Sequence, residues 1–138
     1  MRARQERQRP MGRKRSATLT DGEVKIMRVF WRCGPSTVAD IVDALAGPKA
    51  PAYNTVQTMV RILERKGYVH HRAKEGRAFV FEPAIDESQA RSTALRHMLD
   101  RFFDNSPVSL VLSLLEHEHV SADELKQVES MLREREAR

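Results

Sequence analysis

The 138-residue sequence predicts a mostly helical α+β protein, with helices toward both ends of the chain and one small β-hairpin between them. Apolar residues recur at the i, i+3, i+4, i+7 spacing of an amphipathic helix over most of the chain from residue 20 onward. Between residues 68 and 83 the period changes to alternation, which is typical of strands. Glycine and proline residues separate these segments, so each can be taken in order.

Composition limits the class of protein. The chain has 41% hydrophobic residues, enough for a core, but each half alone would bury little apolar surface. Its single cysteine, Cys33, allows no internal disulfide, which fits a reducing compartment. No segment approaches the length of a membrane span, and the polar N-terminus lacks the apolar core of a signal peptide. We therefore expect a cytoplasmic protein without a membrane segment.

Charge is distributed unevenly along the chain, whose net charge is +5. Residues 1–15 contain seven basic residues and one acidic residue, and residues 1–17 are expected to form a disordered basic tail. Residues 16–83 carry a net charge of +3, whereas residues 84–138 carry −4. This asymmetry suggests that the front half faces a polyanion, although a basic tail that only keeps the chain soluble would also fit.

Two helices follow the tail. Thr20 and Glu23 have the spacing of a capping box, and Gly34 ends the first helix before a proline. Thr37 is expected to be the N-cap of a second, shorter helix. Cys33, like Trp31, is interpreted as a core residue, because lone residues of these types on a helix usually are. The inward-facing residues of the two helices are expected to be Val24, Met27, Phe30 and Trp31, then Val38, Ile41, Val42 and Leu45.

The third helix begins near residue 53 and has an unusual polar face. Its apolar stripe consists of Val56, Met59, Val60 and Leu63, and Gly67 suits the left-handed position after a helix. The opposite face carries two amides, a hydroxyl and two guanidinium groups, on Asn54, Gln57, Thr58, Arg61 and Arg65. It has no carboxylate, whereas most exposed helix faces mix both charge signs.

Residues 68–83 predict a β-hairpin. On its first strand, Val69 and His71 alternate with Tyr68, His70 and Arg72, and on its second, Phe79 and Phe81 alternate with Ala78 and Val80. The turn between the strands is expected at residues 73–76. Basic residues lie near the tip of the hairpin, namely Arg72, Lys74 and Arg77.

The remaining segment predicts three helices. Asp86 opens the first, Ser106 and Pro107 cap the second, and Ser121 with Glu124 forms a capping box for the third. The middle helix, VSLVLSLLEH, is apolar nearly all round and must be buried on more than one side. We therefore expect this segment to pair with the same segment of a second chain. The expected dimerisation residues are Met98, Leu99, Phe102, Val108, Val111, Leu112, Leu114, Leu115, Leu125, Val128 and Leu132.

Three helices followed by a basic hairpin are the layout of a winged helix-turn-helix domain, predicted here for residues 18–83, with residues 84–138 as a dimerisation domain. In this layout the third helix enters the major groove of double-stranded DNA and the hairpin lies against its backbone. Amides can pair with adenine edges and guanidinium groups with guanine, so the polar face suits base reading. An ordinary solvated face is the alternative. A two-fold dimer would place two such helices on the half-sites of a palindromic operator.

Four stretches together give the sequence a specific resemblance: LTDGEVKIMRVFW, NTVQTMVRILERKGYV, KEGRAFVFEP and SLVLSLLEHEHVSADELKQVESML. With them the chain resembles the penicillinase and methicillin-resistance repressors, a family that includes copper-responsive repressors. The resemblance implies a homodimeric winged-helix transcriptional repressor that blocks promoters and dimerises through its C-terminal helices. The DNA-binding positions that it implies are Asn54, Thr55, Gln57, Thr58, Arg61, Arg72, Lys74 and Arg77.

Two departures from the family pattern concern release from DNA. Antibiotic-responsive members are inactivated by cleavage of an Asn-Phe bond in the dimerisation helix, which implies a sensor-linked protease as a partner. The aligned pair here is Ser113-Leu114, which argues against the same cleavage. Copper-responsive members carry paired Cys-x-Cys motifs, and this chain has one cysteine, which argues against copper sensing by thiolates.

Two other classes of function have weaker support in the sequence. His117 and His119 would suit a metal- or ligand-sensing regulator that is not controlled by proteolysis. Imidazoles two residues apart on a helix point about 200° from each other, so they could share a metal only if the helix had ended there. No G-x-S-x-G, glycine-rich phosphate loop or His/Glu metal-ligand motif is present, so we expect no enzymatic activity, no cofactor and no metal.

Overall fold

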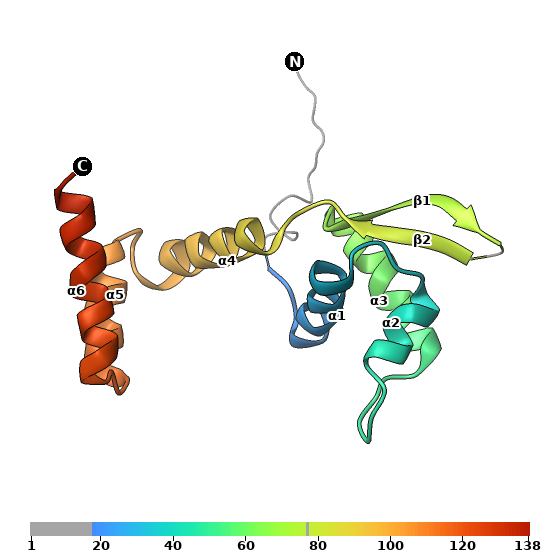
Figure 1. Ribbon diagram of the computed structural model, residues 1–138, viewed down its shortest axis with the longest axis horizontal. Coiled ribbons are helices and arrows are strands. Elements are labelled where there is room, and N and C mark those ends of the chain that lie inside the picture. Colours follow the sequence, from blue (N-terminus) through green and yellow to red (C-terminus); the bar gives the residue numbers. More distant parts are fainter. Residues whose placement is uncertain (1–17, 77) are drawn as a thin grey trace, which may run out of the picture. The chain divides into compact units, whose positions relative to one another are not determined.

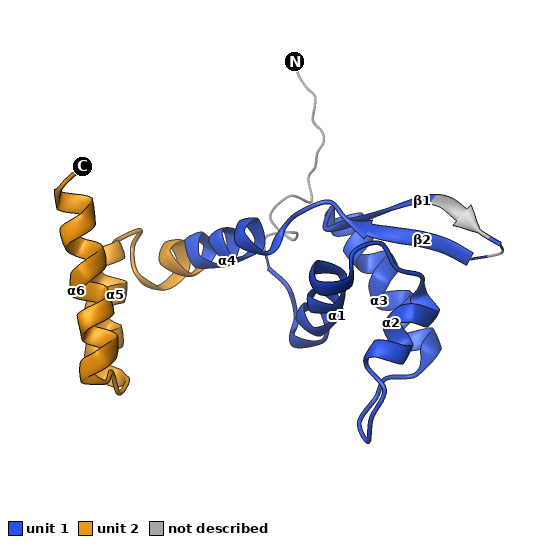
Figure 2. Cartoon of the chain, viewed as in Figure 1, with its two compact units in different colours: residues 1–97 blue, residues 98–138 orange. Residues whose placement is uncertain are grey.

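The computed structural model describes residues 18–76 and 78–138, with the side chains of residues 73–75 left out. These residues form α1 (Asp21–Cys33), α2 (Val38–Ala44), α3 (Tyr53–Lys66), β1 (Val69–Glu75), β2 (Ala78–Pro83), α4 (Glu87–Phe102), α5 (Pro107–His117) and α6 (Ala122–Glu136) (Figure 1). The chain divides into two compact units, residues 1–97 and 98–138 (Figure 2). The predicted tail at residues 1–17 lies outside the described residues. No described helix is long and apolar enough to cross a membrane.

Local capping fixes where the first two helices begin. The hydroxyl of Thr20 accepts the N–H of Glu23, and the Glu23 carboxylate accepts the N–H of Thr20, at 3.2 and 2.8 Å. Thr37 and Asp40 make the same reciprocal pair before α2. Helix α3 begins without a side-chain cap and ends at Gly67, whose φ of 89° is left-handed. The predicted starts of α1 and α2 and the predicted end of α3 are confirmed.

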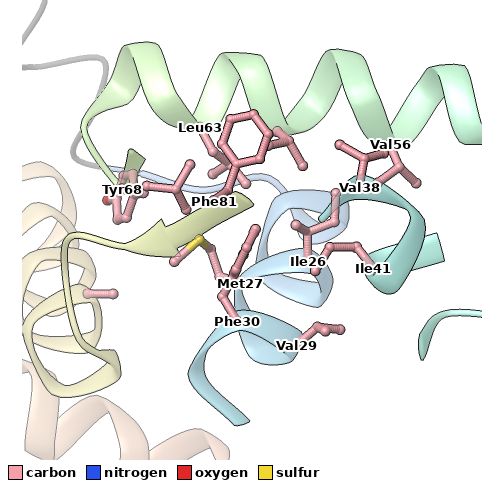
Figure 3. Packing of buried hydrophobic residues seen from close by; sticks show 13 residues of the cluster. Ile26, Met27, Val29, Phe30, Val38, Ile41, Val56, Leu63, Tyr68 and Phe81 are labelled. Carbon is pink, nitrogen blue, oxygen red and sulfur yellow. The ribbon is translucent and has the colours of Figure 1, made fainter. Parts of the chain in front are cut away.

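The core of the first unit is formed by α1, α2, α3 and the hairpin, as Figure 3 shows. Its fully buried side chains include Ile26, Met27 and Phe30 of α1, Ile41 of α2, and Val56, Val60 and Leu63 of α3. Tyr68, Val69 and Phe81 of the hairpin region also belong to it. Since these α3 residues all lie on one side of the helix, its polar side must face outward.

Two sequence predictions about the end of α1 have different outcomes. Trp31 is half-buried and packs against the core, and its indole N–H donates a hydrogen bond to the carbonyl of Ile85 at 2.9 Å. Cys33, in contrast, is exposed, so its prediction as a core residue is wrong. It is the last residue of α1, where Gly34 turns the chain with a φ of 79°.

The hairpin is antiparallel, with Val69 opposite Pro83 and Glu75 opposite Ala78. The predicted turn at residues 73–76 is therefore wrong, because β1 continues to Glu75, which pairs with Ala78 of β2. The register shifts between Arg72 and Lys74, so β1 has one residue more than β2 between these two pairs. Ser36 extends the sheet by exchanging backbone hydrogen bonds of 2.9 Å with Phe81, which ties the start of α2 to the hairpin.

Helix α4 begins in the first unit, where Ala90 is buried in the core. The functional boundary predicted at residue 84 stays a prediction. In the second unit Ser106 caps α5, with Pro107 at its first position, and Ser121 caps α6 through a capping box with Glu124. No residue of α5 or α6 is buried within the single chain.

Candidate nucleic-acid interface

The outer face of α3 is polar and accessible. Asn54, Thr55, Thr58, Arg61 and Arg65 are exposed, and Gln57 is half-buried. On the opposite side Val56, Val60 and Leu63 are completely buried, which fixes the rotation of the helix about its axis. The structure thus brings the six α3 residues predicted to bind DNA onto the solvent side of one rigid helix. Neither arginine of this face forms an ion pair with another described residue.

The single carboxylate of α3 is directed to the hairpin. Glu64 Oε2 accepts the backbone N–H of His71 at 3.0 Å and lies 2.6 Å from Nδ1 of the same histidine. His71 in turn packs against Phe79 and Phe81, with ring centroids 4.9 and 6.1 Å away. These contacts connect α3 with β1 and β2, and they pair the only carboxylate of the helix with His71. No pattern in the sequence predicted them.

The hairpin carries a second network. Arg72 Nε donates to Glu82 Oε2 at 3.2 Å, and His70 Nε2 lies 2.9 Å from Glu82 Oε1. The Arg72 side chain is still half exposed and can therefore reach a ligand. Of the other predicted hairpin residues, Lys74 belongs to β1 but its side chain is not described, and Arg77 lies outside the described residues.

A buried ion pair connects the end of α3 with the start of α1. Lys66 Nζ lies 2.7 Å from Glu23 Oε1 and also donates to the carbonyl of Thr18 at 3.3 Å. Glu23 is only 3% exposed and at the same time completes the α1 capping box. Burial, and then the charge of Glu23, raises the pKa of the neighbouring Tyr68. The capping spacing identified Glu23, but no local pattern could pair it with Lys66.

The predicted dimerisation residues are accessible in the single chain. Ten of the eleven are between 41% and 70% exposed, and Leu99 is half-buried. Met131, which was not predicted, is 65% exposed on α6. The Ser113-Leu114 pair lies within α5, with Ser113 half-buried and Leu114 exposed. A single chain therefore leaves the apolar surface of its second unit uncovered.

One histidine that could support metal sensing, His117, lies at the end of α5. Helix α5 ends at His117, whose Nε2 lies 3.4 Å from the Glu116 carboxylate. Within the described part of the chain, no three His, Cys, Asp or Glu side chains are grouped closely enough to hold a metal ion.

Three helices, the Ser36 bridge and an antiparallel hairpin define a winged helix-turn-helix protein, as predicted. The chain belongs to the penicillinase repressor family, whose model matches residues 19–134. It is similar to the penicillinase repressor of Bacillus licheniformis, with 31% identity over 121 residues, 88% of this chain and 94% of that protein. It is also similar to the methicillin resistance regulatory protein MecI of Staphylococcus aureus (strain N315), with 22% identity over 83% of this chain and 92% of that protein.

A solved structure shares the fold of the chain. The complex structure of hsRosR-S4 matches 92% of this chain and 97% of its own chain, with a TM-score of 0.51 and 16% sequence identity. The predicted family and fold class are confirmed. The family is one of transcriptional repressors rather than enzymes, so the prediction of a non-enzymatic protein is also confirmed.

Proposed function

We propose that this protein is a sequence-specific DNA-binding repressor that acts in the cytoplasm as a homodimer on a palindromic operator. The observation that carries this proposal is the outer face of α3. It is exposed, it has no free carboxylate, and Arg61 and Arg65 have no ion-pair partner among the described residues. Cationic and amide groups presented from one helix suit the major groove of DNA.

Within this proposal the polar residues divide into two groups. Asn54, Gln57 and Arg61 have the groups that pair with adenine and guanine edges, and Thr55 and Thr58 can contact thymine methyls or hydrogen-bonding edges. Arg65, with the hairpin residues Arg72, Lys74 and Arg77, would contact phosphates, which position the protein without reading sequence. Arg72 would then exchange its contact with Glu82 for a phosphate oxygen.

Selection of bound sequences from random DNA tests the proposal. The wild-type protein should enrich one motif with two inverted half-sites about one helical turn apart, as a two-fold dimer requires. Arg61→Ala should enrich a motif with relaxed preference at one position of each half-site. Arg133→Ala removes an exposed arginine of α6 and is the matched control, which should enrich the wild-type motif. Enrichment of no motif by the wild-type protein would contradict the proposal.

Dimerisation is proposed to cover the apolar surface of α5 and α6. Deletion of residues 107–138 should leave a monomer that binds DNA weakly, as measured by sedimentation and by fluorescence anisotropy. Leu112→Glu should also shift the protein toward monomer, because it places a charge in the proposed interface. Gln127→Glu adds the same charge at an exposed polar position of α6 and should leave the dimer intact. A truncated protein that still sediments as a dimer would refute this interface.

Release from DNA is proposed not to use cleavage between Ser113 and Leu114. The bond lies inside α5, so cutting it requires local opening of that helix. A protease site shaped for the amide and the aromatic ring of an Asn-Phe pair loses both interactions with Ser-Leu. Mass spectrometry of the repressor, recovered from β-lactam-treated cells that contain such a protease, should show the intact chain. The variant with Ser113→Asn and Leu114→Phe is the positive control, and a wild-type fragment ending at Ser113 would overturn the proposal.

A further inference from the structure

A cavity of about 180 Å³ lies in the first unit between α1 and the first turns of α4. Leu19, Val24, Ala90 and Ala94 form its aliphatic walls, and Trp31 and Tyr68 contribute aromatic rings. An apolar cavity of roughly 150 Å³ is large enough for a benzene ring. This cavity can therefore accommodate one six-membered ring with a small substituent.

The two aromatic residues of the cavity lining are held in place by the fold. The Trp31 indole is fixed by its hydrogen bond to Ile85. Tyr68 is only 2% exposed, and among the described residues none hydrogen-bonds its phenolic hydroxyl. Its pKa is raised by burial and by Glu23, so the hydroxyl remains a donor at neutral pH. Tyr68 therefore adds a buried, neutral side chain to the lining of the cavity.

The mouth of the cavity has an excess of positive charge. Arg28 and Arg91 line it together with Glu87, and Arg32 joins Arg28 and Glu87 at an adjoining opening. The contact between Arg91 and Glu87 is 3.5 Å long between side chains that are 72% and 53% exposed, so it is weak. Arg28 forms no ion pair with any described residue. An anionic group at this mouth would meet two guanidinium groups and one carboxylate, with the guanidinium group of Arg32 at the adjoining opening.

We propose that this cavity is a binding site for a small amphipathic carboxylate, with a single-ring apolar body against Trp31 and its carboxylate at Arg28 and Arg91. The ligand would contact both α1, which belongs to the DNA-binding core, and α4, which continues into the second unit. Binding would therefore stabilise one position of α4 relative to α1. A resulting change in operator affinity rests on the proposed DNA-binding function, whereas the site itself does not.

Fluorescence of the full-length protein tests the site directly, because Trp31 is the only tryptophan in the chain. Phenylacetate should change the emission saturably, and its neutral analogue 2-phenylethanol should bind at least tenfold more weakly. Arg28→Gln should weaken phenylacetate binding several-fold, whereas Arg96→Gln, on α4 but outside the cavity lining, should not. Ala94→Phe should abolish binding by filling the cavity, with circular dichroism to show that the variant is folded.

Three results would overturn the inference: no saturable change with phenylacetate, equal binding of the alcohol, or full binding by the folded Ala94→Phe variant. Anisotropy of operator DNA with and without phenylacetate then measures the regulatory consequence separately. If phenylacetate changes the fluorescence saturably but the protein enriches no DNA motif, the binding site is supported and the proposed DNA-binding function is refuted. Operator binding without a fluorescence change would do the opposite.

Discussion

Replacement of Lys66 by methionine tests the connection between α3 and α1. Lys66 Nζ lies 2.7 Å from Glu23 Oε1, and the two side chains are 20% and 5% exposed. Removal of one partner of a buried pair costs about 3–5 kcal/mol, because the other charge is left uncompensated. Glu23 keeps the hydrogen bond from the Thr20 N–H, and Lys66 is partly solvated, so we expect a loss of about 2–3 kcal/mol, at or just below the lower end of that range. That is a large share of a typical stability of about 5–15 kcal/mol.

Urea unfolding followed by Trp31 fluorescence measures this loss in the first unit, where the only tryptophan lies. Glu23→Gln is the matched variant, because its amide oxygen can still accept the Thr20 N–H while its charge is gone. It should cost about 1.5–3 kcal/mol, which is the range for a hydrogen bond to a charged group. The double variant should lose less than the two single losses together, with a coupling of about 1–3 kcal/mol. Losses that add within about 0.5 kcal/mol would show that the two side chains are not coupled.

Three further outcomes are expected. Arg61→Ala should weaken binding to the preferred operator by about 1–3 kcal/mol and relax the sequence preference of the protein, as measured by anisotropy. Arg72→Ala should weaken binding to all sequences and reduce by about one the slope of log K against log salt concentration, measured in the same way. An Arg61→Ala protein with unchanged preference would remove that residue from base reading. Ser121→Ala should lower the melting temperature at pH 7, but less at pH 3. The Ser121 backbone hydrogen bond and then its side-chain hydrogen bond lower the pKa of Glu124, and the substitution removes only the second. The stabilisation lost with it is present above the ordinary pKa of a glutamate and disappears as the pH falls. Equal effects at the two pH values would reject this linkage. Tyr68→Phe should change the free energy of unfolding at pH 7 by less than about 0.5 kcal/mol, since no hydrogen bond is lost. Because folding raises the pKa of Tyr68, its neutral hydroxyl stabilises the folded state at pH values below the ordinary pKa of 10.0, and this stabilisation is lost as the pH rises above 10.0. Phenylalanine does not ionise, so Tyr68→Phe should unfold less readily than wild type in urea titrations at alkaline pH. A large loss at pH 7 would show that the hydroxyl has a partner.

Features that depend on a few neighbouring residues could be predicted from the sequence. The capping boxes at Thr20 and Ser121 and the left-handed Gly67 each involve residues at most four apart, so their spacing alone identifies them. The hairpin turn was misplaced because the shift in register after Arg72 depends on how β1 pairs with β2. Cys33 was misplaced because helical spacing does not show where the neighbouring elements stop covering a helix.

The candidate site was predictable to the same extent. The outer face of α3 follows from the period of one helix, so residues such as Asn54 and Arg61 could be assigned without any knowledge of packing. The contact of Glu23 with Lys66 joins residues 43 positions apart, and only the folded chain brings them together. The cavity beside Trp31 likewise needs both α1 and α4, and no pattern within either segment indicates it.

The carboxylates of Glu64 and Glu82 belong to the two elements proposed to bind DNA, and their contacts affect both the position of the hairpin and its charge. A free carboxylate beside phosphates would oppose binding, since like charges repel across a low-dielectric contact. Glu64 instead accepts hydrogen bonds from the backbone and ring of His71, and Glu82 accepts from Arg72 beside His70. The contact of Glu64 with His71 joins α3 to β1, so it fixes the hairpin relative to the helix while it directs the negative charge away from the polar face. The contacts that orient the two proposed DNA-binding elements are thus the ones that reduce repulsion between them and a polyanion.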